Sequence, residues 1–205
     1  MSTAYVPIFS EAFMSNEFFA MISRMKYIDR WALMRNTEHE SLSQHSYEVA
    51  VLAHALAVIS NRKCQTNLDA DRAAVLGLFH DCAEILTGDM PTPVKYYSAE
   101  IRGAYQHVEE AAIGRLVDML PDELQPDYKS ILNMDGDPEL KKLVKAADKI
   151  SALIKCIEER KAGNREFEKA EESTLKAIHA LECEPAEIFL NKFIESYELT
   201  LDQLR

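Results

Sequence analysis

The 205-residue sequence is poor in residues that break regular structure, with 6 glycines and 7 prolines. Because turn-rich sheet proteins need these residues at many positions, their scarcity favours helices. Cysteine is scarce too, and the four cysteines lie far apart with no CxxC pair. A chain of this length buries about 70% of its unfolded surface and needs no external staple, so we expect free thiols.

Long apolar runs and excess positive charge are also missing. The longest nearly apolar run, residues 49–59, is much too short to cross a bilayer, and the N-terminus lacks the features of a secretory signal. We therefore expect a cytoplasmic protein without a membrane partner. Lysine and arginine total 23 against 34 acidic residues, a net charge of -11. This charge opposes DNA and RNA polymers but allows a small phosphate held by one or two local cations.

Apolar residues recur with helical spacing along most of the chain, and no convincing alternating strand is found. We expect an all-α bundle of roughly seven to nine helices, forming one domain over residues 1–205. Residues 1–14 show no clear period and are expected to form an irregular arm. A core over about residues 15–163 would follow it, and then C-terminal helices over 164–205.

Capping signals divide this pattern into helices. Ser15 is expected to cap the first helix, whose inner face ends in Asp29, and a capping box from Ser41 to Gln44 opens a second helix that reaches about Asn61.

A third helix is expected to begin near residues 67–71 and to continue through His80 to Gly88. The loop over residues 88–93 contains two prolines, so it should be stiff and not regular helix. Further helices are expected over 98–120, from Pro121, over 138–163, over 164–181 and from Pro185.

Three of these helices carry ionisable residues on their core sides. His45 lies in the first turn of the second helix, His80 and Asp81 are adjacent in the third, and Asp148 lies on the apolar stripe of helix 138–163. Buried ionisable groups are costly unless they are paired or bound to metal. Two imidazoles and two carboxylates suit a divalent cation with open positions for water and substrate. The alternative is that each is an ordinary hydrogen-bonded polar residue.

In chain order, these residues match the HD-domain superfamily of metal-dependent phosphohydrolases: a first histidine, a His-Asp doublet and a distant aspartate. The sequence further resembles the bacterial 5'-deoxynucleotidases of that superfamily in four blocks, IDRWALMR (28–35), SQHS (43–46), HDCAE (80–84) and TGDMPTPVKY (87–96). The resemblance implies an all-helical HD-domain fold that forms a homodimer. It also implies hydrolysis of deoxyribonucleoside 5'-monophosphates to deoxyribonucleoside and phosphate.

The resemblance assigns the metal ligands as His45, His80, Asp81 and Asp148. The ion could be Mn, Co, Mg or Zn, because such a ligand set accepts several divalent metals. We expect one ion, since superfamily members with two usually carry extra histidines between the doublet and the last aspartate. Only His107 lies in that interval here.

Two further residues are candidates for catalysis. Glu84 follows His80 by four residues and Asp81 by three, so it shares their helix face and is the candidate general acid or base. Without the motif it would be taken for a surface acid. Arg30 offers bidentate donors to a phosphate and would stabilise the charge that develops in transfer. Arg35 is a weaker candidate for the same phosphate.

The remaining expected contacts concern the sugar. Trp31 could pack against it, and Asp89 could accept the 3'-hydroxyl where no room remains for a 2'-hydroxyl, which would select deoxyribose with little base selectivity. Thr92 and Lys95 are further candidates in the same loop. His45, Arg30 and Glu84 complete the expected substrate-binding set. Asp89 could instead simply cap a turn, as aspartates often do.

Two alternative functions are open at this point. One is a nucleoside triphosphate or cyclic-nucleotide hydrolase of the same superfamily, although a polyphosphate would need more local cations than Arg30, Arg35 and Lys95 provide. The other is a non-catalytic helical interaction protein with the acidic helix over residues 164–181 as its surface.

Overall fold

The computed structural model describes residues 16–95 and 97–204, which form helices, loops and one isolated β-bridge. The expected all-helical bundle without sheet is confirmed in these ranges. The longer helices are α2 (Leu42–Lys63), α3 (Ala70–Phe79), α6 (Ala99–Val117), α7 (Gln125–Leu132), α8 (Pro138–Lys161), α9 (Glu168–His179) and α10 (Glu184–Phe193). The shorter ones are α1 (Phe18–Ile22), α4 (Glu84–Thr87), α5 (Thr92–Lys95) and the 3-10 helices η1 (Ser23–Tyr27), η2 (Arg165–Phe167) and η3 (Ile194–Glu198).

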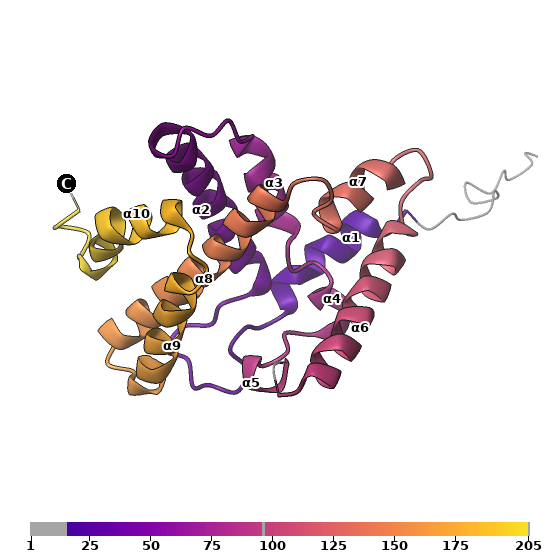
Figure 1. Ribbon diagram of the computed structural model, residues 1–205. Coiled ribbons are helices and arrows are strands. Elements are labelled where there is room, and N and C mark those ends of the chain that lie inside the picture. The colour runs from indigo at the N-terminus through magenta and orange to yellow at the C-terminus, as the bar shows by residue number, and fades with distance from the viewer. Residues whose placement is uncertain (1–15, 96, 205) are drawn as a thin grey trace, which may run out of the picture.

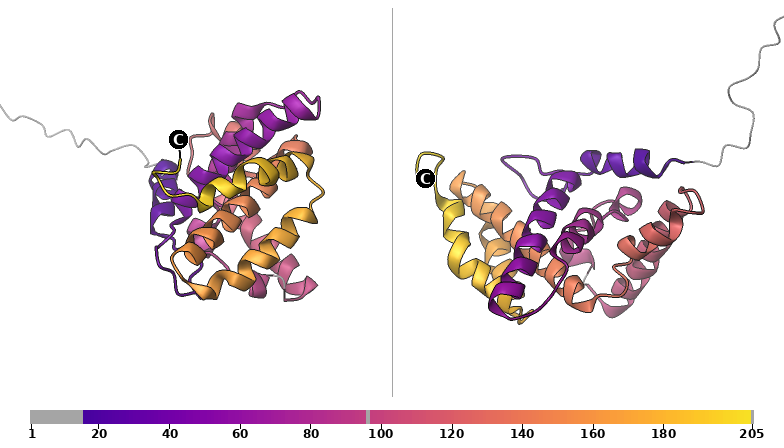
Figure 2. Two further views of the ribbon diagram at one scale, coloured as in Figure 1. Left: turned by 90° about the vertical axis from the view of Figure 1, so that its left-hand side faces the viewer. Right: turned by 90° about the horizontal axis from the view of Figure 1, so that it is seen from above.

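Helix α8 runs through the middle of the molecule, with α9 and α10 on one side and α6 and α7 on the other (Figure 1). The view from above shows the same order (Figure 2). The larger core lies between α2, α3, α8 and α10 and includes Leu56, Leu76 and Ile150. A smaller core around Phe18 and Cys82 joins α1, α6 and α7. The turn after α3 therefore lies where the two cores meet.

The start of α2 is fixed by the predicted capping box. The Gln44 amide donates to the Ser41 hydroxyl at 3.3 Å, and the Gln44 side chain accepts from the Ser41 amide at 2.8 Å. Just before it, the chain doubles back: the Arg30 amide donates to the Glu40 carbonyl and the Leu42 amide to the Ile28 carbonyl. This pairing closes the loop over residues 31–39 at its base and brings Arg30 beside the first turn of α2.

The third helix ends earlier than predicted. Helix α3 stops at Phe79, a turn covers residues 80–83, and α4 restarts at Glu84. The Cys82 amide bonds to the Phe79 carbonyl and the Glu84 amide to the Asp81 carbonyl, which are tight three-residue bonds of the 3-10 type. Since neither glycine nor proline marks this break, local sequence signals do not reveal it.

Other boundaries also differ from the predictions. The first helix tightens into η1 and ends at Tyr27, and Asp29 instead bridges to Ser41. The loop after Gly88 contains one helical turn, α5, because a proline is tolerated in a first turn, where no donor is needed. Helix α7 begins at Gln125 instead of near Pro121, with Pro126 in its first turn.

Several predictions lie outside what the structure tests. The irregular arm over residues 1–14 and the Ser15 cap are not among the described residues. The division at residue 163 and the single domain over 1–205 stay predictions. The four cysteines are free thiols, as expected. Within residues 16–95 and 97–204, no helix is both long enough and apolar enough to span a bilayer.

Helices α2 and α3 touch at Gly77. A Cβ atom built there would lie 2.8 Å from the Cα atom of Ala50, a distance that side-chain movement cannot relieve because the neighbour is backbone. Gly77 is buried, and its position sets how closely the two ligand-bearing segments approach. Gly114, within α6, has no atom within 4 Å of the equivalent Cβ position.

We therefore expect G77A to destabilise the protein by about 1–3 kcal/mol, because the two helices must separate to relieve overpacking. The matched control, G114A, should stabilise it by about 0.5–1 kcal/mol, since alanine loses less backbone entropy in a helix. Urea denaturation followed by circular dichroism measures both. If both variants shift stability in the same direction, the close contact is not limiting.

Candidate metal centre

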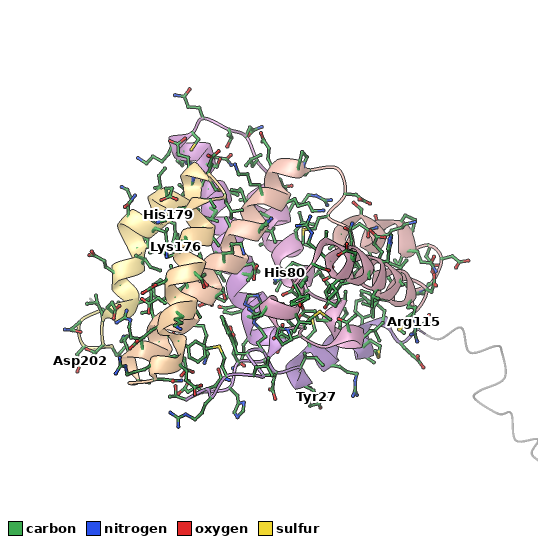
Figure 3. All side chains as sticks on the ribbon, turned by 60° about the horizontal axis from the view of Figure 1, so that its bottom comes forward. Tyr27, His80, Arg115, Lys176, His179 and Asp202 are labelled. Atoms are coloured by element: carbon green, nitrogen blue, oxygen red, sulfur yellow. The ribbon has the colours of Figure 1, made fainter. Side chains whose placement is uncertain are left out.

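Four predicted ligands converge from three segments. His45 comes from the first turn of α2, His80 and Asp81 from the turn after α3, and Asp148 from the middle of α8. One ligand atom from each residue lies within 4.8 Å of the others. Figure 3 shows His80 near the centre of the molecule, well inside surface residues such as Lys176 and Arg115. Helix packing thus brings together residues that lie far apart along the chain.

The spacing of these atoms fits a metal ion. The His45 Nε2 to Asp148 Oδ1 distance is 3.2 Å and the His80 Nε2 to Asp81 Oδ2 distance is 2.9 Å. Ligand atoms about 2.0–2.2 Å from one cation lie about 3–3.5 Å apart. Both Nε2 atoms are buried without a hydrogen-bond partner, whereas the Asp148 side chain is 34% exposed. The cluster therefore offers two free nitrogens and two carboxylates, with an opening to solvent.

The orientation of His80 is set by its other nitrogen. Its Nδ1 lies 2.8 Å from the Gly77 carbonyl, which can only accept, so Nδ1 carries the proton. In the neutral imidazole, the Nε2 lone pair then points toward the two carboxylates. Outer hydrogen bonds of this kind fix the tautomer of metal-binding histidines.

The electrostatics of the cluster favour added positive charge. Burial opposes protonation of His80, but the charge of the adjacent Asp81 carboxylate outweighs it and raises the pKa of His80 to about 9. Burial would also raise the pKa of Asp81 and of Asp148, yet the facing imidazoles hold both below their usual range. A site that attracts a proton this strongly suits a divalent cation, which would neutralise both acids.

Arg30 lies at the edge of the cluster. One guanidinium nitrogen, Nη1, is 3.6 Å from Asp81, and Nε is 3.3 Å from the Glu40 carboxylate. Its side chain is 11% exposed. Glu40 also accepts a hydrogen bond from the Trp31 indole at 2.9 Å and lies 3.8 Å from His45 Nδ1. Glu40 therefore orients the arginine while leaving its outer nitrogens near the ligands.

Trp31 and Asp89 are held together. Trp31 has φ of 58°, a left-handed conformation that is strained for a bulky residue. Its backbone amide donates to the Asp89 carboxylate at 3.2 Å, and its ring packs on Phe167 at 5.3 Å between centroids. The structure thus places both predicted sugar contacts side by side. Strain at such a position is typical of functional sites.

Glu84 is a buried acid with an incomplete set of hydrogen bonds. Its residue surface is 7% exposed, and its Oε2 atom has no partner. Burial, followed by repulsion from Asp81 and Asp89, raises the pKa of Glu84 to about 9. The carboxyl group is therefore neutral near pH 7 and can donate a proton. It lies in the first turn of α4, directly after the doublet.

Other predicted contacts are less central. Lys95 pairs with Glu109 at 2.8 Å and lies over the Tyr105 ring. Arg35 is exposed, and the contacts of its segment are made by its backbone. Thr92 begins α5, and its side chain is outside the described part of the structure.

Three residues near the cluster were missed by sequence reasoning. Glu40 lies in an aperiodic loop, so no pattern singles it out. Ser151 follows Asp148 by three residues and Glu48 follows His45 by three, so each shares a helix face with a ligand. That spacing is the signal that could have found them. Ser151 lies 3.0 Å from His45 Nδ1 and donates to Glu48.

The loop over residues 31–39 is anchored to α8 by a buried ion pair. Lys155 contacts Glu159 at 2.5 Å and donates to the Glu38 carbonyl at 2.7 Å. Glu159 also accepts from the Thr37 amide and from Asn164. Burial alone would raise the pKa of Glu159, but the bonds from Lys155, Asn164 and Thr37 outweigh it and lower this pKa to about 2. Both charged groups have hydrogen-bond partners, so the ion pair is compatible with burial.

We expect E159A to destabilise the protein by about 3–5 kcal/mol, because it leaves the Lys155 ammonium buried without a carboxylate partner. E158Q, one residue earlier on the half-exposed side of α8, should change stability by less than about 0.5 kcal/mol. Thermal denaturation measures both.

The same carboxylate gives a pH signature. Because the folded pKa of Glu159 is depressed, its stabilisation is complete above its unfolded pKa near 4.5 and is lost as the pH falls toward 2. That part of the pH dependence should be absent in E159A. If E159A loses stability at low pH just as the parent does, other carboxylates control this part of the pH dependence.

Comparisons with known proteins agree with this geometry. Residues 17–197 match the family described as "5'-deoxynucleotidase YfbR-like". A 5'-deoxynucleotidase of Pectobacterium atrosepticum is 47% identical over 193 residues, covering 92% of this chain and 96% of that protein. One from Vibrio cholerae is 45% identical over 190 residues, covering 92% and 98%.

Solved structures share the fold. An HD-domain phosphohydrolase from Listeria innocua superposes with a TM-score of 0.77 at 24% identity, covering 88% of each chain. The HD phosphohydrolase of cyanophage S-2L, described as bound to dA and one catalytic Zn²⁺ ion, gives 0.63 at 18% identity, covering 86% of this chain and 96% of that one. Given the family match over most of the chain, the protein belongs to the YfbR-like 5'-deoxynucleotidase family of HD-domain phosphohydrolases.

Proposed function

We propose that the protein hydrolyses deoxyribonucleoside 5'-monophosphates to the deoxyribonucleoside and inorganic phosphate. The observation that carries this proposal is the convergence of His45, His80, Asp81 and Asp148 beside the guanidinium of Arg30. The names of the relatives support the substrate class, since both are called 5'-deoxynucleotidases. The site would serve one phosphate, because Arg30 is the cation that reaches the cluster among the described residues.

Binding of the phosphate is assigned to Arg30. Its Nε is committed to Glu40, so the group cannot rotate freely, and the nitrogens on its far edge face the ligand cluster. A divalent cation held by the four ligands would polarise a phosphoryl oxygen and lower the pKa of a water molecule. Arg30 would neutralise the charge that develops on the transferring phosphoryl group.

Proton transfer is assigned to Glu84. A carboxyl group whose pKa is raised to about 9 holds a proton near pH 7, and the free Oε2 atom has no other partner to donate to. Glu84 would give this proton to the 5'-oxygen as the deoxyribonucleoside leaves. After that step its carboxylate would be stabilised by the nearby Arg30.

Selection of the sugar is assigned to Trp31, Asp89 and Thr92. The Asp89 carboxylate uses one oxygen for the Trp31 amide and keeps another for a 3'-hydroxyl. The wall formed by Trp31 would leave no room for a 2'-hydroxyl. No base-reading residue is part of this proposal, so little selectivity among bases is expected.

Two further features belong to the proposal. We infer one divalent ion, of the Mn, Co, Mg or Zn group, because one set of four ligands is present among the described residues. The cyanophage phosphohydrolase, described as bound to one catalytic Zn²⁺ ion, supports a single-ion site in this fold. We also infer a homodimer, which rests on the family resemblance.

The proposed reaction predicts metal-dependent phosphate release from dAMP, dGMP and TMP and much less from AMP. Hydroxyl exclusion by a buried acceptor site commonly gives discrimination of about 10²-fold or more. A colorimetric phosphate assay with Mn²⁺, Co²⁺, Mg²⁺ or Zn²⁺, repeated after chelation, measures this. Release of pyrophosphate or triphosphate from a nucleoside triphosphate would instead favour a polyphosphate hydrolase. No release from any deoxynucleotide with any metal would exclude the proposal.

E84Q should lower kcat by about 10²–10⁴-fold while leaving metal affinity and folding unchanged. Glutamine resembles the protonated carboxyl in shape and polarity, so the variant removes little besides the transferable proton. E110Q, on the exposed face of α6, is the matched control and should keep the activity of the parent protein. Steady-state kinetics and calorimetric metal titration make the comparison, and a kcat near that of the parent would remove Glu84 from the mechanism.

A further inference from the structure

A chain of hydrogen bonds leads from the proposed metal centre along the facing sides of α2 and α8 to Glu48. It starts at His45 Nδ1, which lies 3.0 Å from the Ser151 hydroxyl. The Ser151 hydroxyl in turn lies 2.5 Å from a Glu48 carboxylate oxygen. Ser151 is fully buried, so water does not compete for these bonds. We call this chain the His45 relay.

The direction of the bonds follows from counting protons. A serine hydroxyl has one proton, and an ionised carboxylate can only accept, so the Ser151 proton belongs to the bond with Glu48. While Glu48 is ionised, His45 Nδ1 faces the Ser151 lone pairs and is the donor in the remaining bond. A neutral imidazole protonated at Nδ1 keeps its lone pair at Nε2. That is the atom that lies 3.2 Å from Asp148, inside the ligand cluster.

The two ring nitrogens of His45 have different surroundings: Nδ1 faces the Ser151 hydroxyl, and Nε2 faces Asp148 in the ligand cluster. The ring is fully buried, and its Nε2 has no hydrogen-bond partner. A neutral imidazole carries one ring proton, on either Nδ1 or Nε2. The His45 relay decides which of these nitrogens holds it.

Two features distinguish the relay from ordinary packing. A buried serine in a helix commonly bonds back to a carbonyl of its own helix, but Ser151 bonds to two side chains of α2. Burial of the Glu48 carboxyl group also costs free energy, since Glu48 forms no ion pair among the described residues. Burial, together with the like charges of Glu40 and Glu158, raises its pKa to about 7. A half-buried acid without a cation partner contributes little to stability, so stability does not explain the presence of Glu48 at this position.

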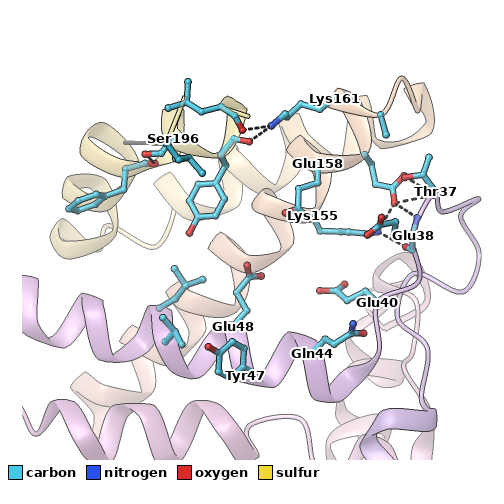
Figure 4. A pocket seen from close by; sticks show the side chains of 18 of the residues that line it. Thr37, Glu38, Glu40, Gln44, Tyr47, Glu48, Lys155, Glu158, Lys161 and Ser196 are labelled. Atoms are coloured by element: carbon cyan, nitrogen blue, oxygen red, sulfur yellow. Dashed lines mark hydrogen bonds and ion pairs between the residues drawn. The ribbon is translucent and has the colours of Figure 1, made fainter. Parts of the chain in front are cut away.

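The outer end of the relay is open to solvent. Glu48 lines a cavity of about 1100 Å³ between α2, α8 and the C-terminal segment, together with Tyr47, Lys155 and Tyr197. Figure 4 shows Glu48 rising from α2 toward the face of α8 that carries Lys155 and Glu158. The carboxyl group can therefore release its proton to water and stay charged above about pH 7, although its inner oxygen faces a buried hydroxyl.

We propose that Ser151 and Glu48 are positioning residues of the metal centre, which hold the His45 proton on Nδ1 and so keep Nε2 available as a ligand. The inference rests on the proposed metal site but not on the identity of the nucleotide. Neither residue belongs to the proposed ligand set or to the proposed phosphate contacts. Their effect reaches the site through the ring of His45.

The test measures metal binding without any nucleotide. S151A should weaken the binding of Mn²⁺ or Zn²⁺ by about 10–100-fold, the usual effect of removing an outer partner of a ligating histidine. E48Q keeps a neutral acceptor and should give an intermediate loss. S46A removes a buried hydroxyl that has no partner, one residue from His45, and should bind metal as the parent does. Isothermal titration calorimetry gives the dissociation constants.

A spectroscopic measurement separates positioning from general destabilisation. In the zinc-loaded parent and in S46A, the His45 Nδ1 proton should appear as a slowly exchanging proton resonance in ¹⁵N-edited spectra. In S151A this resonance should shift and exchange faster, while the metal-free variants melt close to the parent. Parent-like affinity and an unmoved resonance in S151A would overturn the proposal. If S151A does not fold, the metal affinity and the Nδ1 resonance are measured in E48Q instead. Parent-like values for both would then overturn the proposal. If the protein releases no phosphate from deoxynucleotides, the proposed function fails, but the metal-binding measurements still test this inference.

Discussion

Two acids that repel each other have to be held near two imidazoles and one guanidinium, and the arrangement of α2, α3 and α8 serves this requirement. Asp81 and Asp148 are both kept ionised by the histidines they face. None of these groups lies close to the others along the chain, apart from the doublet. The contacts that form the centre are therefore tertiary, and the apolar packing of the helices must supply the free energy that holds the charges in place.

Helix α8 does more than supply one ligand. Asp148, Ser151, Lys155 and Glu159 follow one another by three or four residues and form a polar stripe along the inward-facing side of the helix. The stripe passes from the candidate ligand Asp148 to the His45 relay, and then to the ion pair that anchors the loop over residues 31–39. One helix face thus connects the ligand sphere with the loop that begins next to Arg30.

Predictions from the sequence were most successful where the signal lay in neighbouring residues or in a regular apolar spacing. The capping box at Ser41 was correct because both of its residues are local. The four candidate ligands converge as expected, because apolar spacing placed His45 and Asp148 on inner helix faces and the His-Asp doublet was recognised as a motif. The break after Phe79 could not be predicted, since neither glycine nor proline marks it and the turn residue Cys82 packs into the smaller core through tertiary contacts.

The partners of the ligands were harder to foresee. Ser151 was not singled out, because a hydroxyl carries no periodic signal of its own. Glu40 and Asp89 act from loops, where backbone pairing over a distance decides their positions. Their contacts depend on tertiary distances that a one-dimensional pattern does not contain.

The turn after α3 also has a consequence for anyone who would rebuild such a site. Neighbouring residues on a regular helix point about 100° apart, so an ideal helix cannot direct two consecutive side chains at one ion. Here the tightened backbone brings His80 and Asp81 together, with 2.9 Å between Nε2 and Oδ2. A designer grafting the doublet onto a straight helix would lose one ligand, and would have to copy the distortion along with the residues.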